Sequence, residues 1–301
     1  MATIPQIALH ESLPNATNEE RYQNGASPWP ICLDTATIRP AKGIEEKVKI
    51  AAEAGYDAIE PWDWELAEFE KQGGDLKALG KKIKEMGLFV PSMIGLWGCL
   101  PATEEDFQKS LPATRNRLRM ASAIGCTFAQ AIPNEIGANY NNAFAAGCYR
   151  RLLEIGITEY NVIPSLVFVN LFPLKTMGQA TAVVMDANHP QGKIIPDVFH
   201  MYITGGGFEG LKHVNGNLFA IFQFNDAPKD MKIQDMKDEH RVYPGDGILP
   251  LPQILKDLKQ TGFKGCISLE LYNKTYHTQD LLTVAKTGLK KTLEMIKKAE
   301  V

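Results

Sequence analysis

The chain has 301 residues, of which 45% are hydrophobic and 22% charged, and its formal net charge is −3. These values are ordinary for a globular protein and give no electrostatic reason to expect binding to nucleic acid. No apolar run reaches the ~18 residues that a membrane span requires. The N-terminal stretch MATIPQIALHESLPNATNEE lacks the basic and apolar segments of a secretory signal.

The five cysteines show no pattern of a disulfide-bonded framework. They are odd in number and scattered without a CxxC pair, which favours reduced thiols: Cys32, Cys99, Cys126, Cys148 and Cys266. We therefore expect a cytoplasmic protein that acts on a small molecule, with neither nucleic acid nor a membrane as its partner. The sequence leaves the oligomeric state open.

From residue 31 onwards, short apolar runs alternate with amphipathic stretches. The apolar runs are rich in β-branched or aromatic residues and predict strands at 31–36, 57–61, 88–95, 127–132, 162–169, 193–199, 218–224 and 266–271. Helical patterns that end in glycine lie between them, and examples are 43–55, 75–87, 116–125 and 254–262.

Eight strand-then-helix units predict parallel strands joined by crossover helices. We therefore expect an α/β protein with a single (β/α)8 TIM barrel over residues 31–301, and an N-terminal extension over residues 1–30 that lies on the barrel. The rival architecture is an open doubly wound sheet, which predicts a Gly-rich phosphate turn after an early strand. No GxGxxG motif is present there.

Polar residues at the strand ends are candidates for function, because the reacting groups of a barrel sit at the carboxyl ends of its strands. Six residues qualify by position: Glu60, Asp197, His200, Gln223, Asp226 and Glu270. Asp197 and His200 lie three residues apart, so both can reach one cavity. Glu270 stands in the apolar run SLELY, where a buried acid is costly unless it is paired or bound to a metal. The long polar stretch 225–247 is expected to shape the same site.

Several stretches together resemble a known family: CLDTATIRP, AAEAGYDAIEPW, IIPDVFHMYITGG, FNDAP, DEHRVYPGDGILPL and SLELYNKTYHTQD. The chain is similar to the xylose isomerase-like barrels of sugar phosphate isomerases and epimerases. The resemblance covers nearly the whole chain from about residue 31. It implies one Mn- or Mg-type cation, held by Glu after strand five, Asp after strand six, His after strand seven and Glu after strand eight. It also implies that the two glutamates move a proton through an enediolate.

Two of those four ligands are present. Asp197 matches the strand-six Asp, and Glu270 matches the strand-eight Glu. The other two positions fall at Val167 and Gln223, which replace the strand-five Glu and the strand-seven His. Two further residues match by position, because His200 follows the Asp and Arg241 precedes PGDG. His277 is a third departure, since the family often has Trp at this position.

The departures predict a degraded divalent-metal site. A hard cation needs several oxygen ligands with compensating negative charge, and Val167 offers neither. Gln223 could offer one neutral carbonyl oxygen. We therefore expect no cofactor or a weakly bound divalent cation, with ancestral isomerase activity weak or absent. The pocket should still bind a small polyol or carbonyl compound, with the following residues lining it: Glu60, Trp62, Asp226 and Arg241.

Two other functions stay open. One is a metal-independent enzyme that uses His277, His200 or Glu270 as a base, with Cys99 as a further candidate nucleophile. The other is a non-catalytic sugar-binding protein, in which tryptophans could stack on the sugar: Trp62, Trp64 and Trp97. The departures themselves have two possible origins, a natural paralogue or an engineered pocket. The apolar Val167, together with His277 as an added base nearby, favours an engineered pocket.

Overall fold

The computed structural model describes residues 22–133 and 141–301 of the chain. All eight predicted strands are present and pair in parallel. They are β1 (Ile31–Asp34), β2 (Ala58–Glu60), β3 (Ser92–Trp97), β4 (Phe128–Ile132), β5 (Ile163–Val167), β6 (Ile194–Ile195), β7 (Phe222–Phe224) and β8 (Ile267–Leu269). Almost every residue of these strands is buried, as expected for parallel strands that are covered on both faces.

The strands close into a barrel. Regular pairing gives two four-stranded sheets, in the orders β2-β1-β8-β7 and β3-β4-β5-β6. Two isolated parallel bridges join these sheets at each seam, and they include Trp62 with Ile94 between β2 and β3, and Asp197 with Gln223 between β6 and β7. The expected (β/α)8 architecture is therefore confirmed.

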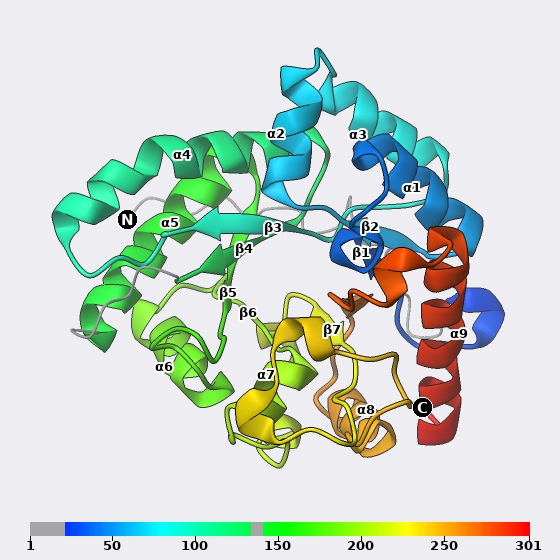
Figure 1. Cartoon of the computed structure of the whole chain (residues 1–301). Coiled ribbons are helices and arrows are strands. Elements are labelled where there is room, and N and C mark those ends of the chain that lie inside the picture. Colours follow the sequence, from blue (N-terminus) through cyan, green and yellow to red (C-terminus); the bar gives the residue numbers. More distant parts are fainter. Residues whose placement is uncertain (1–21, 134–140) are drawn as a thin grey trace.

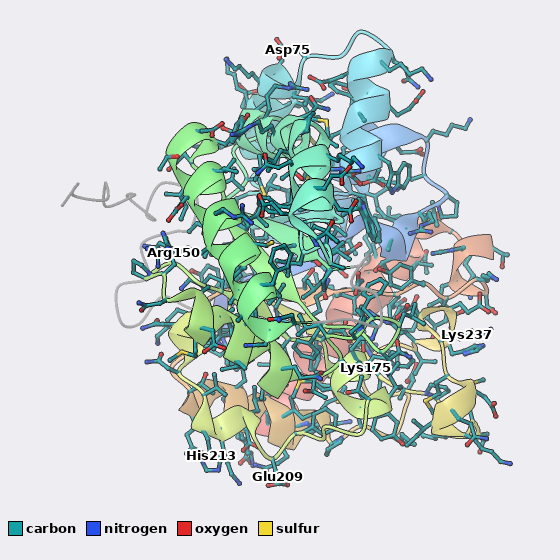
Figure 2. The ribbon with its side chains drawn as sticks, turned by 90° about the vertical axis from the view of Figure 1, so that its left-hand side faces the viewer. Asp75, Arg150, Lys175, Glu209, His213 and Lys237 are labelled. Atoms are coloured by element: carbon teal, nitrogen blue, oxygen red, sulfur yellow. The ribbon has the colours of Figure 1, made fainter. Side chains whose placement is uncertain are left out.

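Helices surround the strands (Figure 1). They are α1 (Gly43–Ala54), α2 (Asp63–Lys71), α3 (Leu76–Glu85), α4 (Glu104–Ala123), α5 (Asn142–Tyr160), α6 (Met177–Ala187), α7 (Val198–Ile203), α8 (Leu251–Gln260) and α9 (Leu281–Ala299). The last helix packs beside α1, and β8 pairs with β1, so the first and last units of the chain are neighbours. Exposed charged side chains such as Asp75, Glu209 and Lys237 lie at the outer edge of the molecule (Figure 2).

The helix ends follow from local sequence. Asp75 caps α3, because its carboxylate accepts hydrogen bonds from the backbone N–H groups of Lys77 and Ala78. Gly55 ends α1 in the left-handed region at φ 90°, a conformation that costs glycine little. None of the helices in the described part of the chain has the length and apolarity to cross a lipid bilayer.

Most of the expected N-terminal extension falls outside the described residues. In its described part, Trp29 is buried and its indole Nε1 donates a hydrogen bond to the carbonyl oxygen of Phe263 at 3.0 Å. The side chain of Gln23 donates to the carbonyl oxygen of Gly55 and to Asp57, each at 2.9 Å. Residues 22–30 are therefore tied to the barrel.

Candidate functional site

The site lies in a cavity at the carboxyl ends of the strands. Its volume is about 230 Å³, which suits a small molecule. It is lined by residues that include Trp62, Trp97, Gln130, Val167, Phe168, Phe172, Asp197, His200, Gln223, Asp238, Arg241, Glu270 and Tyr272. The cavity thus contains six residues that the sequence singled out at strand ends or by family position: Val167, Asp197, His200, Gln223, Arg241 and Glu270.

Arg241 is fully buried and bridges the two acids. Its Nη1 donates to Asp197 Oδ2 at 2.9 Å and to Glu270 Oε2 at 2.5 Å. Its Nη2 donates to Asp238 Oδ1 at 2.7 Å. Burial opposes the charge, but the neighbouring carboxylates raise the pKa of Arg241 well above its ordinary value. The guanidinium therefore stays charged, between the two acids that the resemblance assigns to a cation.

Asp197 positions the next candidate, His200. Asp197 is the N-cap of α7, and its Oδ1 accepts a hydrogen bond from the backbone N–H of His200 at 2.9 Å. The sequence predicted a strand up to residue 199, whereas the strand ends at Ile195 and a short helix starts directly after Asp197. The helix brings His200 into the cavity, and its Nε2 lies 3.0 Å from Arg241 Nη2.

His200 is neutral and its tautomer follows from its neighbour. Burial lowers the pKa of His200, although Asp197 opposes this shift. Arginine has only N–H donors, so His200 Nε2 must accept the hydrogen bond from Arg241. The hydrogen of the neutral ring is therefore on Nδ1, and His200 is not a free base in this arrangement.

Glu270 has the properties of an acid–base group. Burial raises the pKa of its carboxyl to about 7, although the neighbouring Arg241 opposes the shift. Its Oε1 accepts a hydrogen bond from the Tyr272 hydroxyl at 2.5 Å, while Oε2 accepts from Arg241. A carboxyl group with a pKa near neutrality can both accept and release a proton in the working range.

Two more carboxyl groups lie beside each other on neighbouring strands, Asp34 on β1 and Glu60 on β2. Both are fully buried, and burial raises the pKa of each. Glu60 accepts hydrogen bonds from Gln130 Nε2 at 2.7 Å and Ser268 Oγ at 2.8 Å. Glu60 therefore positions Gln130, which lines the cavity. Glu60 itself is not one of the lining residues.

Aromatic side chains form one wall of the cavity. Trp62 stacks on Trp97 with ring centroids 6.1 Å apart and meets Tyr272 edge-on at 6.2 Å. The guanidinium of Arg39 lies 5.3 Å from the Trp62 ring centroid. This wall offers flat apolar faces of the kind that pack against sugar rings. Trp64 does not contribute, because it is 47% exposed and lies beside Lys47.

Asp226 was expected to contact the ligand, but the chain uses its carboxylate for another purpose. Asp226 bridges to Val242 in an antiparallel pair, which fixes the adjacent Arg241. Its side chain accepts hydrogen bonds from four backbone N–H groups, those of Ala227, Gly245, Gly247 and Leu249. Asp226 therefore organises the loop that carries Arg241.

The two other candidates for metal-free chemistry also lie outside this cavity. His277 is half-buried, and its Nε2 donates to the carbonyl oxygen of Ala36 at 2.9 Å. Burial lowers the pKa of His277, so the ring is a neutral donor to the backbone. Cys99 is buried, and burial raises the pKa of its thiol, which disfavours the reactive thiolate.

The residues present depart from the ligand set that the resemblance assigns to a divalent cation. Val167 lines the cavity with an apolar side chain. Both remaining acids already have a cationic partner in Arg241, and Asp197 Oδ2 also accepts from Asn225 Nδ2 at 3.2 Å. The charge of both acids is therefore partly offset by Arg241, which leaves less negative charge for a cation. Within residues 22–133 and 141–301, no group of three His, Cys, Asp or Glu residues is placed to hold a metal.

The sequence reasoning missed several residues of the cavity. Gln130 is a polar residue in an apolar strand, the same signal that identified Glu270, so the strand pattern could have found it. Tyr272 follows Glu270 by two residues and was not among the sequence candidates. Asp238 and Phe172 lie in loops, where the sequence offers no comparable signal.

Comparisons with known proteins agree with this architecture. The model of the family described as xylose isomerase-like TIM barrel matches residues 48–299. An inosose isomerase of Bacillus velezensis is 23% identical over 89% of this chain and 97% of its own length. An inosose isomerase of Bacillus licheniformis is 31% identical, but that alignment spans 42% of this chain and 45% of the relative.

The solved structures give the same fold. A crystal structure of IOLI protein with a binding zinc atom superposes with a TM-score of 0.81. The two sequences are 22% identical, and the match covers 89% of this chain and 98% of the other. The family model spans most of the chain and all of the strands from β2 onwards. The chain therefore belongs to the xylose isomerase-like TIM barrel family.

Proposed function

We propose that this protein binds a small polyol or carbonyl compound in the barrel-mouth cavity without a resident divalent cation, and that its isomerase activity is weak or absent. One observation carries the proposal. The Arg241 guanidinium makes charged hydrogen bonds to both Asp197 and Glu270, the two acids that would otherwise hold the cation. The positive charge of the site is then supplied by the protein itself.

The ligand class rests on the cavity and on the relatives. The volume of about 230 Å³ suits a molecule of monosaccharide size or smaller, and the stacked pair Trp62 and Trp97 offers a flat apolar wall. Asp197, Asp238 and Gln223 offer polar atoms on the other side. Two relatives are named inosose isomerases, and an inosose is a ring polyol with one ketone group.

The test combines metal analysis with ligand binding. Elemental analysis of the dialysed protein should find less than stoichiometric Mn, Mg or Zn. Calorimetry with a panel of small sugars, inososes and inositols should show binding that is unchanged by added Mn²⁺. A stoichiometric ion that survives dialysis, or binding that requires Mn²⁺, would refute the proposal.

Glu270 favours a second candidate function, a metal-independent proton transfer next to a carbonyl group. Burial raises the pKa of Glu270 to about 7, and Arg241 places a fixed positive charge beside it. The ionised carboxylate would take the proton from the carbon next to the carbonyl, leaving an enolate and a neutral acid. The same acid would then return the proton, and the charge of Arg241 would stabilise the enolate in between.

Isotope exchange distinguishes the two functions. Incubation of the bound ketone in D₂O, followed by NMR, should show deuterium uptake at the carbon next to the carbonyl if proton transfer occurs. Glu270→Gln should abolish the exchange and leave binding in place. Loss of exchange in His277→Ala would assign the base to His277 instead. Binding with no exchange would leave the protein as a non-catalytic sugar-binding protein.

A further inference from the structure

Asp34 and Glu60 are two acids that meet inside the barrel. They are register partners on the neighbouring parallel strands β1 and β2, so their side chains point to the same side of the sheet. Glu60 accepts hydrogen bonds from Gln130 on β4 and Ser268 on β8, which places both acids in the barrel interior. Both residues are fully buried. Neither acid lines the cavity, and the proton transfer considered above uses neither of them.

Two neighbouring buried carboxyl groups favour the sharing of one proton, because two ionised groups would repel each other. Burial and then the charges of Glu270 and Glu60 raise the pKa of Asp34 well above its ordinary value. Burial also raises the pKa of Glu60, although its hydrogen bonds, among them one with the Asp34 side chain, oppose the shift. A carboxyl group donates a hydrogen bond only when it is protonated, so a bond between two carboxyl groups requires one neutral acid.

The groups around the pair do not offset a second negative charge. Glu270 acts on Asp34 as a further acid, and its cationic partner is Arg241. The guanidinium of Arg39 lies over the Trp62 ring. The other titratable side chains beside the pair are neutral, because burial raises the pKa of each: Cys32, Cys126, Cys266 and Tyr272.

The hydrogen bonds indicate which of the four carboxyl oxygens carries the proton. Asp34 Oδ1 accepts from the backbone N–H of Ala36 at 2.7 Å and from the indole Nε1 of Trp62 at 3.2 Å. Both oxygens of Glu60 also accept hydrogen bonds. Asp34 Oδ2 accepts none within the described chain. An oxygen that no donor faces fits the hydroxyl of a neutral acid, which donates to Glu60.

We propose that Asp34 is a neutral carboxylic acid that positions Trp62, and that its ionised partner Glu60 positions Gln130. Trp62 stacks on Trp97 to form the aromatic wall, and Gln130 lines the same cavity, so one shared proton fixes two parts of it. Loss of that proton at alkaline pH places two negative charges side by side, drives the carboxyl groups apart and releases the Trp62 indole. The effect on ligand affinity rests on the proposed function, whereas the location of the proton does not.

Infrared spectroscopy locates the proton in the wild-type protein without a ligand. A neutral carboxyl group has its C=O band at higher frequency than an ionised one. At about pH 8, where Glu270 with its pKa of about 7 is mostly ionised, one such band should remain and should move to lower frequency when aspartate carries a ¹³C carboxyl group. Asp34→Asn should remove the band, and Asp75→Asn, at the exposed cap of α3, should leave it unchanged. A band that moves only with ¹³C-labelled glutamate, or no band at all, overturns the proposal.

The indole N–H signal of Trp62 reports the positioning directly. The chain has four tryptophans, so ¹⁵N-labelled tryptophan gives a simple NMR spectrum in which Trp62→Phe assigns the signal. Asp34→Ala removes the acceptor and should shift this signal, whereas Asp34→Asn keeps a carbonyl oxygen and should restore it. Rising pH should move the wild-type signal towards that of Asp34→Ala and should leave the Asp34→Asn signal in place. The Trp29 indole, which donates to Phe263, is the internal control and should not move.

Calorimetry with an inosose and with dihydroxyacetone connects the acid pair to ligand binding. Asp34→Ala should bind about tenfold more weakly than the wild-type protein, the effect of roughly one lost hydrogen bond, and Asp34→Asn should restore the affinity. Either an unshifted Trp62 signal or an unchanged affinity in Asp34→Ala refutes the positioning role. If that variant fails to fold by circular dichroism, equal pH responses of the Trp62 signal in the wild-type protein and Asp34→Asn refute it instead. Absence of binding by both probes in the wild-type protein refutes the proposed function, while the infrared and indole signals still decide the acid pair.

Discussion

Asp197 and Gln223 are bridge partners at the ends of the neighbouring parallel strands β6 and β7. Any side chain at position 223 therefore lies beside the Asp197 carboxylate. Val167 pairs with Ile195, two residues before Asp197, so it stands on the other side of the same acid. The two replaced ligand positions thus flank one of the two that remain.

This arrangement predicts that a cation site can be rebuilt. Val167→Glu combined with Gln223→His adds a carboxylate and an imidazole next to Asp197, which raises both the negative charge and the number of donor atoms. Calorimetry should show uptake of Mn²⁺ by the double variant and none by the wild-type protein. Adding Asp197→Asn should weaken the uptake again.

The buried Arg241 is a competitor that the rebuilt site must overcome. Arg241→Met in the double-variant background removes this charge and should strengthen Mn²⁺ binding. If neither the double nor the triple variant takes up metal, the assignment of these strand positions to the family ligands is wrong.

Arg241 also predicts a large effect on stability. Arg241→Met leaves Asp197 and Glu270 buried without their cationic partner, and removal of one member of a buried ion pair typically costs about 3–5 kcal/mol. Arg115→Met is the matched control, because Arg115 pairs with Glu159 where both side chains are more than one-third exposed. That change should cost no more than ~1 kcal/mol. Urea unfolding measures both, and equal losses would contradict the bridging role of Arg241.

The barrel was predictable because its signals are local. Each strand is an apolar run, and helical stretches such as α1 and α3 end at glycines, so a short window of sequence decides each element. Asp197, Gln223 and Glu270 were found for the same reason, as polar residues at the ends of apolar strands. The barrel topology then brings them together without further information.

The rest of the site depends on contacts that no local window contains. Arg241 lies between Asp197 and Glu270 only because the loop after β7 folds back, and that path depends on the Asp226 carboxylate. His277 follows the last strand as closely as a site residue would. Its ring nitrogen nevertheless donates a hydrogen bond to the backbone carbonyl oxygen of Ala36, which follows β1. Sequence position placed it near the barrel mouth but could not say which way the side chain turned.

Asp226 offers a test of that loop. Asp226→Ala removes the acceptor of four backbone N–H groups, and each buried donor left unpaired costs about 1–3 kcal/mol. We expect a marked loss of stability in urea unfolding, together with weaker ligand binding because Arg241 loses its support. Asp226→Asn keeps one acceptor oxygen, so its stability should lie between those of the wild-type protein and Asp226→Ala. If either variant weakened ligand binding with unchanged stability, Asp226 would contact the ligand directly, as the sequence first indicated.

Glu270 predicts how stability depends on pH. Its pKa is raised from 4.5 to about 7 by burial, so the folded protein binds this proton more tightly than the unfolded chain does. The free energy of unfolding contributed by Glu270 is therefore greatest below the unfolded pKa and falls as pH rises towards about 7. Glu270→Gln mimics the neutral acid and removes this dependence.

Relative to the wild-type protein, Glu270→Gln should gain at least ~1 kcal/mol between about pH 5 and about pH 8, measured by urea unfolding of both proteins at each pH. Asp34 and Glu60 also have raised pKa values and push stability in the same direction, but they are present in both proteins. The difference between the two curves therefore isolates Glu270. A difference that stays constant over this range would mean that Arg241 keeps Glu270 ionised throughout, and the proton-transfer role proposed for Glu270 would then lose its basis.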